Sequence, residues 1–454
     1  MREFIRSVAG EVFTTTALDE VLKELCLTYG PRFAGSIEAA AAANYMADWF
    51  NNEGLANVAL ETFPLAVWQR GAAHLEMTAP VQRAFPCLAL PYSAAGTVSG
   101  PIVDLGMCTG ADVRARSGEL PGAIALVDDR NPPQGPALHR LQKYVMVRGA
   151  GAAAFLFVQA APGGLEPTGT VAFNQHGKLD QTILSAGLSH ETGAELRARA
   201  CGGPMEARLT VDCGMNWGTC HNVAAELPGE TDELVILCGH YDGHDISHGA
   251  VDNASGTAAV METMRILKQL KPMNRCTVRA VLFSAEEVGL VGSNAYVQAH
   301  RDELTRIRLV LNLDCFSGDD GLRLLVQGSE ALEKKLAGFL EPLPDKPRVF
   351  RHLVPFSDHF PFHLAGAASA FCCVPSGPGR GWGHTIADTH DKLDIFSMRR
   401  ALASFIPIVA STAGDGVWPP PESDRDALIK ELTDRHLEDL LRYEGHWPAE
   451  CGDE

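Results

Sequence analysis

Between Gly239 and Gly256 the chain reads GHYDGHDISHGAVDNASG, a polar and glycine-rich stretch with an apolar run before it and a periodic one after it. Residues 234–238 are a short and wholly apolar run, which is typical of a buried strand. Residues 257–270 repeat apolar side chains every three or four positions, as one face of a helix does. A strand that passes into a helix through a polar loop predicts an α/β sheet, and such sheets bind their ligands at the carboxyl ends of the strands.

This stretch contains side chains that bind metal ions in proteins. His240 and Asp242 stand where the expected strand ends, and Asp252 comes just before the expected helix, where Ser255 could be the N-cap. Imidazole and carboxylate groups suit a borderline cation such as zinc. The Asp242 carboxylate could also accept the second ring N–H of His240 and fix the tautomer that binds the metal. Since surface loops are also rich in Asp and His, these residues alone leave the choice open.

Further candidate ligands follow two more strand-like runs. Glu286 and Glu287 come after one run, Asp314 ends the other, and His384 follows a glycine-rich loop at 376–383. Because adjacent carboxylates repel each other unless a cation lies between them, one glutamate could bind metal while its neighbour transfers protons. Two metal ions bridged by one carboxylate would be held by five ligands: His240, Asp252, Glu287, Asp314 and His384.

The motifs around these residues resemble a known enzyme family. They are GHYD, VDNASG, SAEEVG, NLD and HTIADT, in that order, with PFSDHFPF as a further matching element. The family is that of the co-catalytic zinc exopeptidases, which includes bacterial leucyl aminopeptidases, glutamate carboxypeptidase II and carboxypeptidase Q. YGPRFAGS at 29–36, WQRG at 68–71 and the tight spacing of His240 and Asp252 make the chain most similar to carboxypeptidase Q-like members.

The resemblance implies an α/β fold with a mixed, largely parallel sheet flanked by helices, and two Zn²⁺ ions per chain. Asp252 would bridge the ions, Glu287 would be a ligand, and Glu286 would be the general base. Asp242 would orient His240. The implied activity is that of a di-zinc metallopeptidase, an aminopeptidase, dipeptidase or carboxypeptidase Q-like enzyme. It would cleave the peptide bond of dipeptides or short peptides with a water bridged between the two ions.

Two features depart from the family pattern. Val251 occupies a position where the family often has a second acid, although the bridging acid itself is present. The loop also carries His244 and His248, which are not among the ligands that the resemblance implies. We expect these two histidines to be solvated loop residues or contacts outside the ring of metal ligands.

Other functions remain possible on the same scaffold. A deacylase of amino-acid conjugates and a glutaminyl-cyclase-like enzyme are alternatives, and a cyclase of this fold would use one zinc ion. A non-catalytic binding protein is a third alternative, which the complete set of five ligand types disfavours. A net charge of -18 without a basic run argues against a nucleic-acid partner. A peptide or dipeptide is therefore the expected partner.

The residue pattern changes between residues 67 and 213, where short apolar runs alternate with Gly and Pro. This part resembles the β-rich protease-associated domain that several members of the family carry as an insertion. We therefore expect a discontinuous catalytic domain at 1–66 and 214–418, the insertion at 67–213, and a C-terminal helical tail at 419–454. The tail is expected to be one acidic helix with a leucine stripe, which would dock on its own chain or contribute to a homodimer.

Nothing in the sequence indicates a membrane protein. No stretch approaches the ~20 apolar residues of a membrane span, and the N-terminus lacks the apolar core of a signal peptide. The chain has 12 cysteines, and without a signal peptide they fit a reducing compartment better than a disulfide framework. We therefore expect a cytoplasmic location and no membrane partner.

Overall fold

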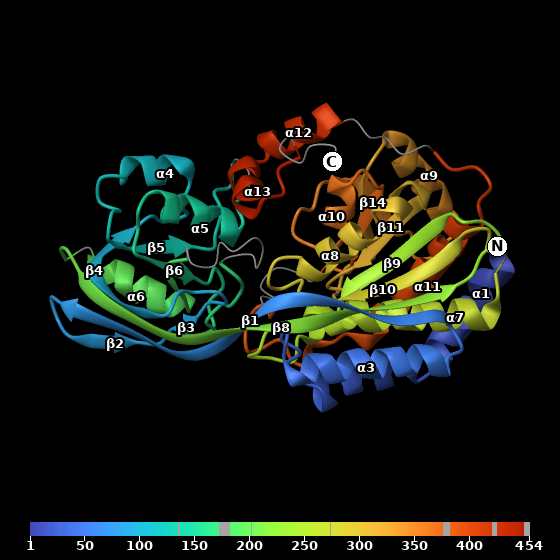
Figure 1. Ribbon diagram of the computed structural model, residues 1–454, viewed down its shortest axis with the longest axis horizontal. Helices are drawn as coiled ribbons and strands as arrows, with labels where there is room; N and C mark the ends of the chain where they lie inside the picture. Colours follow the sequence, from blue (N-terminus) through green and yellow to red (C-terminus); the bar gives the residue numbers. More distant parts are fainter. Residues whose placement is uncertain are drawn as a thin grey trace. The chain divides into compact units, whose positions relative to one another are not determined.

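The computed structural model describes residues 1–134, 137–171, 182–200, 202–272, 274–375, 382–419 and 425–448 (Figure 1). The glycine-rich loop expected at 376–383 falls outside these residues, apart from its last two. The chain divides into two compact units. The first contains Met1–Leu65, Gly218–Gly383 and Ala387–Ser423, and the second contains Ala66–Trp217, His384–Ile386 and Asp424–Glu454.

The first unit is built on a mixed sheet with the strand order β13-β12-β14-β11-β9-β10-β8. These strands are β8 (Glu206–Leu227), β9 (Leu234–His240), β10 (Thr277–Phe283), β11 (Ile307–Leu313), β12 (Arg323–Gln327), β13 (Arg348–Arg351) and β14 (Ser369–Cys373). From β14 through β11 and β9 to β10 the neighbours are parallel, whereas β12 and β8 pair antiparallel with β14 and β10. The predicted α/β class with a mixed, largely parallel sheet is confirmed.

Helices cover both faces of this sheet. They include α1 (Arg2–Thr14), α2 (Ala17–Lys23), α3 (Ile37–Asn52), α7 (Ser255–Leu270), α8 (Val291–Ala299), α9 (Glu330–Leu340), α10 (His359–Leu364) and α11 (Ile395–Gly414). Alternate residues of β9 belong to different cores, because successive side chains of a strand point to opposite faces. Leu237 packs in the core formed with α7 and α11, and Ile236 packs in the other.

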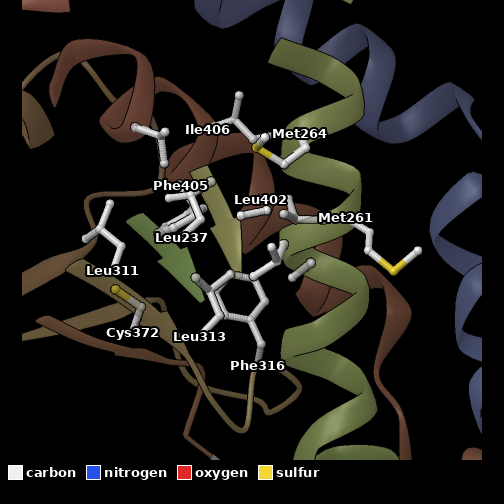
Figure 2. Close-up of a cluster of buried hydrophobic side chains, with 14 of the residues drawn as sticks. Leu237, Met261, Met264, Leu311, Leu313, Phe316, Cys372, Leu402, Phe405 and Ile406 are labelled. Atoms are coloured by element: carbon white, nitrogen blue, oxygen red, sulfur yellow. The ribbon is translucent and has the colours of Figure 1, made fainter. Parts of the chain in front are cut away.

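Figure 2 shows the larger core, between the strands and helices α7 and α11. It labels Leu237, Met261, Met264, Leu311, Leu313, Phe316, Cys372, Leu402, Phe405 and Ile406. On the opposite face, Phe283 of β10 contacts Tyr296 of α8 and Phe362 of α10, with ring centroids 5.7 Å and 6.2 Å away. Burial on both faces explains why the central strands read as continuous apolar runs in the sequence.

The second unit contains its own sheet, with the order β4-β5-β6-β7-β3. The elements are β3 (Leu88–Ala89), β4 (Gly96–Asp104), β5 (Ile124–Asp128), β6 (Ala154–Val158), β7 (Leu184–Leu188), α4 (Gly110–Ala115), α5 (Arg140–Gly149) and α6 (His190–Ala200). Strands β4 to β7 are parallel neighbours. Two long strands, β1 (Ala56–Ala79) and β8, each contribute residues to both units, and β2 (Arg83–Phe85) pairs with β1.

The C-terminal tail forms two helices, so the prediction of a single helix is wrong. Helices α12 (Arg425–Asp434) and α13 (Glu438–Glu444) are separated at His436, whose φ of 56° is incompatible with a continuous right-handed helix. The tail belongs to the second unit, where Gln142 of α5 donates to the carbonyl of His436 at 2.8 Å. Four leucines of the expected stripe are buried, namely Leu432, Leu437, Leu440 and Leu441. The tail thus docks on its own chain.

Among the residues that the structure describes, no helix combines the length and the apolar character needed to cross a membrane.

Candidate metal centre

The loop of residues 241–254, here called the metal-binding loop because it carries the predicted ligand Asp252, joins β9 to α7 at the carboxyl edge of the sheet. His240 is the last residue of β9, and Asp252 lies just before α7 with non-helical dihedral angles, φ -119° and ψ 90°. A Cβ on Gly256 would lie 2.1 Å from the carbonyl oxygen of Leu313, so only glycine allows α7 to begin beside the end of β11. This close approach brings Asp252 near Asp314, the residue that follows β11.

Ser255 does not cap α7, contrary to the expectation from the sequence. Its hydroxyl donates to the carbonyl of Val251 at 2.7 Å and accepts from the amide of Phe316 at 2.8 Å. The side chain of Asn253 links the start of α7 to the end of β11. It donates to Leu313 O at 2.9 Å and accepts from Gly256 N at 2.8 Å. These bonds tie the loop to the segment that carries Asp314.

Three predicted ligands converge on one point. Nε2 of His240 lies 3.3 Å from Oδ1 of Asp252 and 3.7 Å from Oδ1 of Asp314. One ligand atom from each of the three residues lies within 4.8 Å of the other two. Nitrogen and oxygen ligands of a tetrahedral zinc ion, each about 2.0–2.1 Å from the metal, lie roughly 3.3–3.5 Å apart. The residues present therefore fit a zinc ion.

The electrostatics of the cluster also favour a bound cation. Burial lowers the pKa of His240, but the nearby acids, Glu286 first and then Asp252 and Asp314, outweigh burial and raise that pKa well above its ordinary value. Burial raises the pKa of Asp242 to about 7 and holds that of Glu286 well above its usual range. So many acidic groups in a buried place repel one another, and a cation would relieve that repulsion.

The two adjacent glutamates have different surroundings. Both lie in the turn after β10, where Ala285 has a φ of 63°. Glu287 is buried, and its Oε2 lies 2.9 Å from Nε2 of His244, whereas Glu286 keeps a small part of its surface exposed. His244 is itself buried, so it is a contact of a predicted ligand and not a solvated loop residue. His248 accepts from the amide of His390 through Nδ1 at 3.2 Å.

Asp242 connects the metal-binding loop to both glutamates. Its Oδ1 accepts from the amide of Glu286 and its Oδ2 from the amide of Glu287, each at 3.2 Å. The same carboxylate lies 3.7 Å from Nδ1 of His240, whereas the main-chain oxygen of Asp242 lies 3.1 Å from that nitrogen. The main-chain oxygen is therefore the nearer partner of the imidazole, and the carboxylate fixes the turn that carries Glu286 and Glu287.

A buried serine that the sequence did not single out contacts a predicted ligand. Ser357 donates to Oδ2 of Asp314 at 2.7 Å and accepts from Nδ2 of Asn312 at 2.6 Å. This relay fixes the direction of the serine hydroxyl and so the orientation of the Asp314 carboxylate. Ser357 lies within the motif PFSDHFPF, which marks the segment as similar to the family. No spacing in the sequence, however, pairs this serine with Asp314.

We expect Ser357→Ala to weaken zinc binding by about 10–100-fold, the usual effect of removing a partner that orients a metal ligand. A competition titration against a chelating dye would measure the change. Ser369→Ala is the matched control, because Ser369 is also fully buried and its hydroxyl has no hydrogen-bond partner among the described residues. Equal zinc affinities for the two variants would show that the Ser357 hydroxyl does not support the site.

The remaining predicted ligand, His384, is part of the second unit. It has a φ of 57°, and its carbonyl oxygen accepts from the amide of Thr168 at 2.8 Å within that unit. Its role as a metal ligand stays a prediction. Arg32 and Asp388 also bind the metal-binding loop, although no pattern in the sequence assigned them to it.

Comparisons with known proteins identify two domains in the chain. Residues 222–409 match peptidase family M28, and residues 98–196 match the PA domain. Carboxypeptidase Q of Bos taurus is 27% identical over 326 residues, which cover 68% of this chain and 68% of that protein. The probable leucine aminopeptidase 2 of Aspergillus oryzae is 28% identical over 276 residues, which cover 58% of this chain and 53% of its own.

Solved structures share the fold. The peptidase M28 precursor from Shewanella amazonensis aligns with a TM-score of 0.80 and 21% identity, over 93% of this chain and 99% of that chain. A zinc aminopeptidase from Bacillus subtilis aligns with a TM-score of 0.68 and 23% identity, over 89% of this chain and 97% of its own. The resemblance drawn from the motifs, including that of the inserted segment to a PA domain, is confirmed.

Proposed function

We propose, for a chain that carries a metallopeptidase domain of family M28 together with a PA domain, that it is an exopeptidase acting on dipeptides or short peptides with two zinc ions. The observation that carries the proposal is the convergence of His240, Asp252 and Asp314 at the spacing of zinc ligands. The names of similar proteins, carboxypeptidase Q and leucine aminopeptidase, support an exopeptidase.

The proposed two-ion site uses all five predicted ligands. Asp252 would bridge the ions, and Glu287 and His384 would complete the coordination begun by His240 and Asp314. The buried position of Glu287 beside His244 supports a ligand role for this carboxylate. When bound, the two ions would supply an activated water and polarise the scissile carbonyl.

The proton transfers would fall to Glu286. Its carboxylate would take a proton from the attacking water and deliver it to the leaving amine. Asp242 supports this role because it holds the main chain of Glu286 and Glu287 by one hydrogen bond each. One glutamate can thus stay fixed on metal while the other moves a proton.

We further propose that the first compact unit is the catalytic domain and that the second contains the inserted domain and the tail. The PA match at 98–196 lies within the second unit and supports this division. The homodimer and the cytoplasmic location stay predictions.

Removal of metal is the primary test of the proposed function. Elemental analysis should find two zinc ions per chain, and a chelator should abolish peptide hydrolysis until zinc is added back, because the activated water depends on the ions. A fully active protein with a single tightly bound ion would contradict the two-ion proposal.

A substrate screen of the zinc-loaded protein separates the remaining alternatives. Hydrolysis of free dipeptides, but not of N-blocked dipeptides, would identify recognition of the amino end. Hydrolysis of acylated amino acids in preference to dipeptides would identify a deacylase. Cyclisation of N-terminal glutamine would identify a cyclase, and the absence of any turnover would leave a binding protein.

A further inference from the structure

We propose that Arg32 and Asp388 are positioning residues that hold the metal-binding loop in its ligand-bearing shape before any metal binds. The inference rests on the proposed function, because it takes His240 and Asp252 as zinc ligands. Arg32 lies in the N-terminal motif YGPRFAGS and Asp388 in HTIADT, so the two are far apart in the sequence. Both belong to the first unit, as the loop does.

Arg32 is fully buried, and its guanidinium group donates to five main-chain oxygens. The acceptors are Tyr241 O at 2.6 Å, Leu25 O at 2.7 Å, Gly30 O at 2.6 Å, His248 O at 2.8 Å and Gly249 O at 3.0 Å. Three of these carbonyls belong to the metal-binding loop. The guanidinium group therefore connects the start and the middle of the loop to the segment that follows α2.

These hydrogen bonds satisfy both the buried charge of Arg32 and the buried carbonyl groups of the loop. A buried charge is tolerated only when its hydrogen-bonding capacity is used, and the carbonyls of a buried loop need donors that secondary structure does not supply. At Gly249 the chain has a φ of 52°, and an added Cβ would lie 2.9 Å from the Asp252 carbonyl oxygen. The loop turns tightly there, which brings its carbonyl groups together around one planar, five-donor cation.

Asp388 binds the same loop through its amides. Its Oδ1 accepts from Val251 N at 2.8 Å, and its Oδ2 accepts from Asp252 N at 3.1 Å. Asp388 is buried, and charge-assisted bonds of this kind are about twice as strong as neutral ones. A cation thus holds the carbonyls of residues 241, 248 and 249, and an anion holds the amides of residues 251 and 252.

These anchors set the distance between the proposed ligands His240 and Asp252. His240 is fixed by the sheet, whereas Asp252 is carried by the loop, so the loop decides the 3.3 Å between their ligand atoms. The carboxylates around the site repel one another without metal, and a loop without anchors would relax away from this geometry. A site that is already assembled binds its ligand more tightly because no ordering is needed on binding.

The test uses Arg32→Lys with Arg308→Lys as its matched control. A lysine keeps the charge but has three donors on one nitrogen and cannot serve five carbonyls. Arg308 is also a buried arginine that binds main-chain oxygens, those of Thr412 at 3.0 Å and Asp415 at 2.6 Å, but it lies on β11 away from the loop. We expect Arg32→Lys to weaken Co²⁺ binding to the metal-free protein by about 10–100-fold and to alter the visible absorption of the cobalt form.

If Arg32→Lys binds Co²⁺ with unchanged affinity and an unchanged absorption spectrum, the proposal is overturned. It is also overturned if Arg308→Lys weakens Co²⁺ binding to the same extent as Arg32→Lys. If Arg32→Lys does not fold, Asp388→Asn replaces it, because an amide presents a donor to one of the two loop amides. Its expected effect is the same loss of affinity, whereas Asp391→Asn, an exposed acid nearby, should change nothing.

Amide hydrogen exchange of the metal-free wild-type protein measures whether the loop is ordered without metal. We expect the amides of Val251 and Asp252 to exchange at least tenfold more slowly than in an unstructured chain, since both are bonded to Asp388. Exchange at the unstructured rate would contradict the proposal. Failure of the proposed function would look different, because the wild-type protein would then bind no cobalt while its loop remained protected.

Discussion

Glu286→Gln is expected to lower kcat by about 10²–10⁴-fold, the usual contribution of a general base, while both zinc ions stay bound. Glutamine keeps the size and a polar head, but it cannot accept the proton of the attacking water. The amide of Glu286 would still donate to Asp242, so the turn that carries both glutamates should keep its shape. Steady-state kinetics and elemental analysis of the same preparation would measure both quantities.

Glu287→Gln is the matched comparison, since it makes the same chemical change one residue later. Glu287 is buried against His244, where the proposal places a metal ligand. Its substitution should therefore weaken the binding of one of the two zinc ions, and activity should recover at least in part when zinc is added in excess. Loss of metal in Glu286→Gln together with full retention in Glu287→Gln would reverse the two roles. Full activity of Glu286→Gln would rule out the hydrolytic mechanism.

The parts of the fold that the sequence predicted are those with a clear local pattern. The run at 234–238 is buried on both faces of the sheet and became β9, and the periodic run at 257–270 became α7. The predicted ligands His240 and Asp314 could be found because each ends or follows such a run. Parallel strands place their carboxyl ends at one edge, so residues far apart in sequence could be expected to meet there.

The parts that the sequence could not predict depend on contacts between distant segments. Ser255 has the residue type of an N-cap, but its hydroxyl donates to Val251 and accepts from Phe316, next to a segment whose dihedral angles at residues 252 and 253 are not helical. The tail has the leucine periodicity of one helix, yet it breaks at His436 and docks on α5. Arg32 binds carbonyl oxygens, which carry no side-chain signal, so no pattern in the sequence could pair it with the loop.

Asp252→Ala is expected to remove both zinc ions and to lower peptide hydrolysis by about 10³-fold or more, because a bridging carboxylate is a ligand of each ion. The structure places this residue beside another predicted ligand and fixes its main chain. Its Oδ1 lies 3.3 Å from Nε2 of His240, and its amide is held by Asp388. Metal content after dialysis and the rate of dipeptide hydrolysis would both be measured.

The number of ions lost distinguishes a bridging ligand from an ordinary one. Glu287→Gln should lose or weaken one ion and Asp252→Ala two, whereas the exposed Asp391→Asn should keep both. A protein that retains one tightly bound zinc after Asp252→Ala would show that this carboxylate serves a single ion. The assignment of Asp252 to both ions would then be wrong, whereas the proposed role of Glu286 as general base would still be tested by Glu286→Gln.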